Sequence, residues 1–166
     1  MRRRLQLAAR CAVPAALVVT ALTMAEAHAE DGLADVRAAT VKYHSVTQAD
    51  KDGYADPGLP CFDSPSTGEG MGTHLVNGQL LDDGGTLTRT QPEALVYEVR
   101  DGSLKLVAVE YIVQMSDSAT APEFLGETMI ANNDLGLWTL HAWIWRDNPV
   151  DLFESYNANV ELCPGS

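Results

Sequence analysis

Residues 95–115, with the sequence LVYEVRDGSLKLVAVEYIVQM, decide the fold class of this chain. Two apolar runs rich in valine and leucine flank Asp101-Gly102, a dipeptide that favours the two-residue turn of a β-hairpin. Counting back from that turn places Glu98 opposite Lys105. The stretch therefore predicts a long antiparallel hairpin, with Glu98 and Lys105 as an exposed pair of opposite charges.

Further strands are expected on both sides of this hairpin. Asn77-Gly78 is a second two-residue turn signal and predicts a hairpin over residues 73–81. Short strands are predicted over residues 124–131 and 159–163, and a strand rich in tryptophan over residues 137–146. Between the strands predicted over residues 137–146 and 159–163, residues 150–156 predict a short helical turn.

The N-terminal part of the domain has a different pattern. Residues 33–46 have helical spacing of their apolar side chains, with Asp31 as the expected N-cap. Residues 49–70 are rich in Asp, Gly, Pro and Ser and predict a long surface loop. Together with the strands, these patterns predict a mainly β fold: a small antiparallel barrel or sandwich with one N-terminal helix packed outside.

The first 29 residues have the three parts of a cleavable signal peptide. Arginines follow Met1, residues 11–24 form an apolar stretch, and Ala27-His28-Ala29 offers the small-x-small pattern that signal peptidase accepts. The apolar stretch is shorter than the roughly 20 residues needed to cross a bilayer. We therefore predict cleavage after Ala29, export to the periplasm or the cell exterior, and a single globular domain over residues 30–166.

Residues 30–166 are strongly acidic. They hold seven Lys and Arg side chains against 22 Asp and Glu, a formal charge of −15. A phosphate backbone and an anionic lipid surface would both repel such a chain. We therefore expect no nucleic-acid partner and, after signal cleavage, no membrane partner.

Two cysteines, Cys61 and Cys163, follow the predicted cleavage site. Disulfides form in oxidising compartments, so an even number of cysteines in an exported chain favours a bridge. The alternative is a pair of buried free thiols. A Cys61–Cys163 disulfide would tie the end of the chain to the predicted loop after the first helix.

Glu110 is the carboxylate that most needs a partner. Alternation along the long hairpin places it on an apolar face. Its expected neighbours there are Leu104, Leu106, Ala108 and Ile112, with Leu95, Tyr97 and Val99 across from them. An isolated buried charge is prohibitive, so Glu110 must be paired, protonated or bound to an ion.

Two histidines, His74 and His141, lie on other predicted strands. Two histidines and one carboxylate are the ligand set of a facial metal triad, or of a zinc site that keeps an open position. We therefore single out His74, Glu110 and His141 as candidate ligands of a divalent metal ion. The alternative is three separately hydrogen-bonded polar groups in a core.

Aromatic side chains suggest a second kind of site. The candidates for lining a small-molecule pocket inside a barrel are Tyr97, Tyr111, Trp138, Trp143 and Trp145. The alternative is an ordinary aromatic core.

Several segments resemble a family of small exported bacterial proteins with no assigned activity. They are Met71-Gly72-Thr73-His74, residues 92–97 (PEALVY), Val109-Glu110-Tyr111, residues 140–149 (LHAWIWRDNP), and residues 157–160 (NANV) with Cys163. They span most of the predicted domain. The resemblance implies an exported, β-rich fold and supplies no catalytic residues.

These observations support three functional hypotheses. The leading one is an extracytoplasmic binding protein that holds a metal ion or a small ligand near His74, Glu110 and His141. The second is an enzyme that uses the same three residues as a catalytic metal site, and the third is a structural domain that packs against a partner. An open coordination position beside a cleft would favour the enzyme, and a closed, dry cluster would favour the structural domain.

Overall fold

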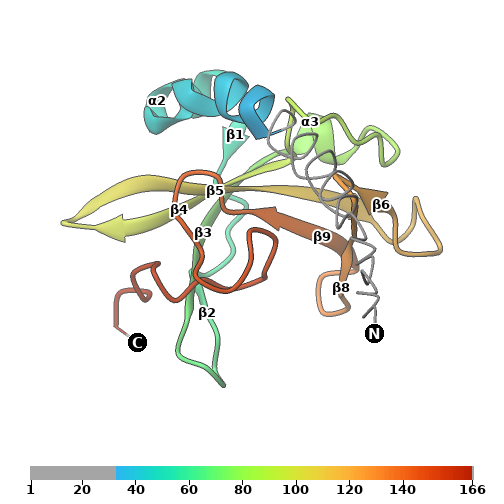
Figure 1. Ribbon diagram of the computed structural model, residues 1–166. Coiled ribbons are helices and arrows are strands. Elements are labelled where there is room, and N and C mark those ends of the chain that lie inside the picture. Colours follow the sequence, from blue (N-terminus) through green and yellow to red (C-terminus); the bar gives the residue numbers. More distant parts are fainter. Residues whose placement is uncertain (1–32, 166) are drawn as a thin grey trace, which may run out of the picture.

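One antiparallel sheet runs through the centre of the protein in a computed structural model that describes residues 33–165 (Figure 1). Within that range the sheet has seven strands in the order β1-β3-β4-β5-β9-β8, and β2 pairs beside β3. The mainly β, antiparallel class is confirmed, although the sheet stays open along this path and does not close into a barrel. The predicted signal peptide, residues 1–29, and Asp31 lie outside the described residues.

The predicted central hairpin is confirmed. β4 (Ala94–Arg100) and β5 (Ser103–Gln114) are joined by Asp101 and Gly102, which have φ angles of 53° and 70°. Positive φ at both turn residues is the geometry of the tight hairpin turn that an Asp-Gly pair favours. Glu98 stands opposite Lys105, as predicted.

A β-bulge in β5 changes which side chains share a face. Tyr97 pairs with Leu106 and Val96 with Ala108, so Val107 is an extra residue without a cross-strand partner. One extra residue reverses the alternation of side chains from that point onward.

Because of the bulge, the predicted surroundings of Glu110 are partly wrong. Four of the residues expected around it lie on the other side of the sheet, in the core that faces the helices: Leu95, Tyr97, Leu104 and Leu106. The expected neighbours Ala108 and Ile112 do share its face. The bulge therefore places Glu110 on the face of the sheet that also carries His74 of β3 and His141 of β9.

Further strands extend the sheet on both sides. β3 (Gly70–Asn77) pairs with β4, and β9 (Leu137–Ala142) pairs with β5. The short strands β1 (Tyr54–Ala55), β2 (Phe62–Asp63) and β8 (Ile130–Asn132) also belong to this sheet. By contrast, β6 (Glu123–Phe124) and β7 (Glu127–Thr128) pair with each other in a separate two-stranded sheet. The tryptophan-rich strand is thus confirmed but ends at Ala142, earlier than predicted.

The predicted hairpin at Asn77-Gly78 is wrong. Asn77 ends β3 and caps the short helix α3 (Gly78–Leu81), its side-chain oxygen accepting hydrogen bonds from the backbone N–H groups of Gln79 and Leu80. Asn is a favoured residue both in tight hairpin turns and at helix N-caps, and here the cap is formed. β3 pairs with β4 instead of with residues 79–81.

Three further predictions need correction. The segment 49–70 is not one loop, because it contains the end of a helix and the strands β1 and β2. Residues 150–156 form turns and bends without a helix. Residues 159–163 form no strand; nearby, Asn157 makes an isolated β-bridge to Gly70.

The two faces of the sheet are covered by different segments (Figure 1). The helical segment formed by residues 33–40, η1 (Val41–His44) and α2 (Val46–Lys51) packs on one face, where Leu33, Val36 and Tyr43 join the larger core. The C-terminal segment covers part of the opposite face, where Val160 packs with Val96 and Trp143 in a smaller core. The predicted N-terminal helix, residues 33–46, is therefore confirmed as an α-helical stretch followed by η1, whereas α2 extends the helical segment into the predicted loop.

The predicted disulfide is confirmed. Cys61 and Cys163 are bonded, with their Cα atoms 5.8 Å apart. The bridge joins the segment before β2 to the end of the chain. No helix among the described residues is long and apolar enough to cross a membrane.

Candidate metal centre

Three strands of the sheet, β3, β5 and β9, carry the candidate ligands to one point, and β4 lies between β3 and β5. Glu110 on β5 stands directly opposite His141 on β9. On its other side Glu110 pairs with Ala94 of β4, and His74 of β3 pairs with Val96. Because Ala94 has only a methyl group, the side chains of His74 and Glu110 meet across β4.

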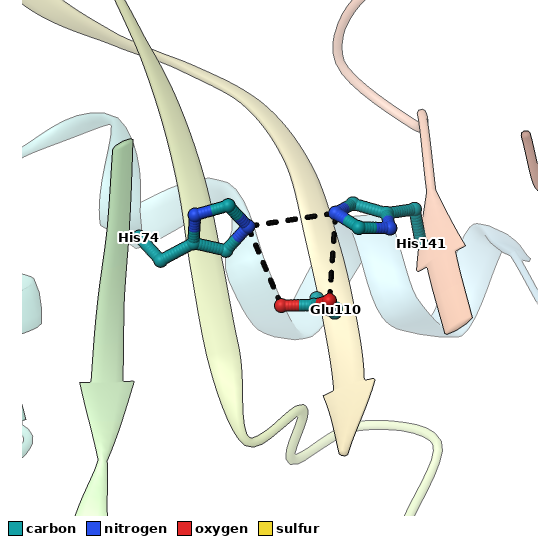
Figure 2. A group of neighbouring side chains, drawn as sticks. All are labelled: His74, Glu110 and His141. Carbon is teal, nitrogen blue, oxygen red and sulfur yellow. Dashed lines mark hydrogen bonds and ion pairs between the residues drawn. The ribbon is translucent and has the colours of Figure 1, made fainter. Parts of the chain in front are cut away.

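The three side chains converge (Figure 2). His74 Nε2 lies 3.4 Å from one carboxylate oxygen of Glu110, and His141 Nε2 lies 3.5 Å from the other. The two Nε2 atoms are 3.5 Å apart. These separations are longer than the 2.7–3.2 Å typical of hydrogen bonds.

Burial sets the charge states of the cluster. It raises the pKa of Glu110 to about 8, with a further contribution from the negative charge of Glu93. It lowers the pKa of His74 to about 4 and that of His141 to about 3, the latter also through its neighbour His74. At neutral pH both imidazoles are therefore uncharged, which is the form that binds metal ions, and their contacts with Glu110 are not ion pairs.

Neighbouring rings hold the two imidazoles in place. His141 stacks on Trp143, with ring centroids 5.6 Å apart and planes 11° from parallel. His74 makes edge contacts with Phe62 and with His141. The second ring nitrogen of His74, Nδ1, is buried and has no hydrogen-bond partner among the described residues, so the outer acceptor that metal-ligating histidines usually have is missing there.

The spacing of the nitrogens fits a shared ion. Zn²⁺ is held at about 2.0–2.2 Å, and two ligands at a tetrahedral angle at that distance lie about 3.4 Å apart. The observed separation of the Nε2 atoms, 3.5 Å, matches this value. Among the described residues, these three are the group of His, Cys, Asp or Glu side chains placed to hold an ion together.

The cluster forms part of the floor of a cleft of about 620 Å³. The cleft is bounded by the segment around Leu59, by β3 and β5, and by the β8–β9 hairpin with Leu135 at its turn. A pocket of this size is in the range of small-molecule sites. The three candidate ligands thus line a space of the size that small molecules occupy.

The five aromatic residues of the predicted pocket do not gather around this cleft. Tyr97 and Tyr111 lie on the helix side of the sheet, and Trp143 lies on the opposite side. The cleft is lined by none of the five predicted residues: Tyr97, Tyr111, Trp138, Trp143 and Trp145. Their OH and N–H groups donate hydrogen bonds to oxygens elsewhere in the fold, as aromatic residues of a core do.

The sequence does not predict the burial of two other carboxylates, Glu93 and Glu98. Glu93 accepts a hydrogen bond from the backbone N–H of Ile112 at 2.9 Å, just before β4 begins and past the Ala94–Glu110 pair of the β4–β5 ladder. Glu98 is 1% exposed and is bonded to Arg146, Arg100 and the backbone N–H of Glu161. The predicted pairing of Glu98 with Lys105 is therefore correct, whereas the predicted exposure of Glu98 is wrong.

Comparisons with protein-family models, with curated proteins and with solved structures find nothing that matches this chain. The resemblance to a family of small exported bacterial proteins stays a prediction.

Proposed function

We propose that this protein binds a zinc ion, or a divalent ion of similar preference, with His74, Glu110 and His141. The observation that carries the proposal is the convergence of three buried donor groups at separations longer than those of typical hydrogen bonds and suited to a tetrahedral ion. A bound cation would also offset the cost of keeping the Glu110 carboxylate ionised in a buried site.

We further propose that the protein works outside the cytoplasm. The Cys61–Cys163 disulfide supports this, because such bridges persist in oxidising compartments. The signal-peptide pattern of residues 1–29 supports it independently.

The direct test is a zinc titration of metal-free protein by competition with a chromophoric chelator. One equivalent should bind, and Glu110→Gln should weaken binding more than the tenfold to hundredfold typical of losing an outer-shell partner, since it removes a direct ligand. Zinc at a hundred times its dissociation constant should raise the free energy of unfolding by about 2.7 kcal/mol in the parent protein.

The matched control is His44→Gln. His44 lies on the helical segment against Trp145, remote from the cluster in the fold. Its substitution should leave the zinc affinity unchanged. Zinc binding that is insensitive to Glu110→Gln, or equally sensitive to His44→Gln, would contradict the proposal.

A catalytic role for the same ion is the second candidate function. The cleft favours it, because catalytic zinc sites combine three protein ligands with a position open to substrate, whereas structural sites are closed by four. A purely structural role for the ion is not supported, because His74, Glu110 and His141 line the cleft.

A further inference from the structure

The rim of the cleft gathers exposed apolar side chains. Leu59, Ile130 and Leu135 all line it, and they are 38%, 49% and 42% exposed. The other large apolar side chains that are exposed among the described residues are Val41, Val150 and Leu162. Half of these exposed apolar side chains therefore surround one opening, which is typical of a ligand-binding groove.

The charges of the cleft exclude highly anionic ligands. No lysine or arginine of the described residues lines it, and its two carboxylate residues are Glu110 on the floor and Asp134 at the rim. Sites for phosphate or for several carboxylates normally supply arginine or lysine. The lining instead combines apolar side chains with uncharged polar ones such as Asn133, Thr139 and Tyr156.

One wall of the cleft is held in place covalently. Leu59 and Phe62 lie on either side of Cys61, whose disulfide partner is Cys163. Phe62 also packs against the ring of His74. The apolar wall therefore contacts the candidate ligand His74 and is linked through Cys61 to the C-terminal segment.

We propose that this cleft binds a small, uncharged, amphipathic molecule. Its polar end supplies a nitrogen or oxygen donor to the ion held by His74, Glu110 and His141. Its apolar part lies between the segment carrying Leu59 and the β8–β9 hairpin carrying Leu135. The proposal rests on the proposed function, because the ion provides the polar half of the binding site.

The test compares two probes that share a donor and differ in apolar length, 1-methylimidazole and 1-butylimidazole, at alkaline pH where both are uncharged. Calorimetry on zinc-loaded protein should show up to about sixtyfold tighter binding of the butyl probe, which adds three methylene groups to be buried. With cobalt in place of zinc, the visible absorption should change on adding either probe, because the donor joins the coordination shell.

Two variants locate the binding surface. Leu135→Asp places a charge on the rim and should remove most of the butyl advantage, while Val150→Asp changes an equally apolar, 67% exposed residue outside the cleft and should not. Leu59→Asp repeats the test on the other wall. Unchanged zinc affinity in each variant shows that the fold is intact.

The outcomes that would overturn each proposal are distinct. Equal affinity for the two probes, or equal effects of Leu135→Asp and Val150→Asp, would overturn the amphipathic ligand while zinc binding stands. Tighter binding of butyl phosphate than of 1-butylimidazole would overturn the choice of an uncharged ligand. Failure of the parent protein to take up zinc would overturn the proposed function, and this proposal with it.

Discussion

The buried carboxylates Glu93, Glu98 and Glu110 are accommodated in three different ways. Glu98 is matched by arginines, Glu93 by a backbone N–H group, and Glu110 by two uncharged histidines. The need of Glu110 for a partner could be predicted, because an apolar run surrounds it in the sequence. Glu93 and Glu98 could not, because they become buried through contacts with segments distant in the sequence.

Glu93 should make the protein less stable as the pH rises. Burial raises its pKa from 4.5 to about 7, so the folded state holds a proton that the unfolded chain has already lost between these two values. The free energy of unfolding therefore falls with rising pH across that window and levels off above it. Glu93→Gln keeps an acceptor for the backbone N–H of Ile112 and removes this pH-dependent loss of stability.

Relative to the parent protein, Glu93→Gln should gain stability by up to about 3 kcal/mol between pH 4 and pH 8, taking about 1.4 kcal/mol per pKa unit. Urea denaturation of metal-free protein at each pH measures the difference. Glu127→Gln, which changes an exposed carboxylate on β7, should differ from the parent by no more than about 0.5 kcal/mol at every pH. If the difference in free energy of unfolding between Glu93→Gln and the parent protein did not change with pH, the expectation would be refuted.

At the scale of single elements, two similar turn signals had opposite outcomes. Asp101-Gly102 forms the hairpin turn because apolar runs of matching length flank it on both sides. Asn77-Gly78 is followed by only a few residues before another acidic turn, and Asn77 caps a helix instead. Local sequence predicts that such a dipeptide ends a strand, whereas tertiary pairing decides whether a strand or a helix comes next.

The bulge at Val107 marks the limit of predicting faces by alternation. Counting along β5 placed Glu110 on the face of Leu106, whereas the extra residue separates them. Valine is an ordinary strand residue, so the sequence carries no signal of a bulge there. β5 is buried on both faces from Leu106 to Val113, so Glu110 needs partners on either face, and His74 and His141 supply them.

Gly72 should be essential for the path of β3. Its φ of 103° is strained for any residue with a Cβ atom, and an added Cβ would meet the carbonyl oxygen of Tyr97 on the neighbouring strand. Gly72→Ala should therefore lower the free energy of unfolding by about 2 kcal/mol or more. Thermal or urea denaturation measures the loss.

The matched control for this prediction is Gly78→Ala. Gly78 begins α3, and nothing lies within 4 Å of the position its Cβ would occupy. Alanine should there be neutral or stabilising by up to about 1 kcal/mol. Equal effects of the two substitutions would show that the contact with Tyr97 is unimportant.

At the scale of the whole molecule, the C-terminal segment is fixed to the sheet by Glu98. This carboxylate accepts hydrogen bonds from Arg146 at 3.1 and 3.3 Å and from the backbone N–H of Glu161 at 3.0 Å. The segment also adds Val160 to the smaller core. The residues that cover this face come from the last part of the chain, for which the sequence predicted a strand that does not form.

Removing Arg146 should cost far more than removing an arginine on the surface. Arg146→Met leaves Glu98 buried with Arg100 as its remaining ionic partner, so unfolding should become easier by about 2–4 kcal/mol. Arg89→Met breaks an exposed ion pair with Asp35 and should cost less than about 1 kcal/mol. Chemical denaturation of both variants compares them, and similar losses would mean that Glu98 does not fix the segment.

The disulfide closes a covalent ring that contains most of the described residues, but not the N-terminal helical segment or β1. Cys61 and Cys163 are 102 positions apart, and His74, Glu110 and His141 all lie between them. A single proteolytic cut in a loop of this ring, for instance near Asp134, would leave the two fragments joined. Such nicked protein would migrate as one band on a non-reducing gel and keep His74, Glu110 and His141 in one molecule.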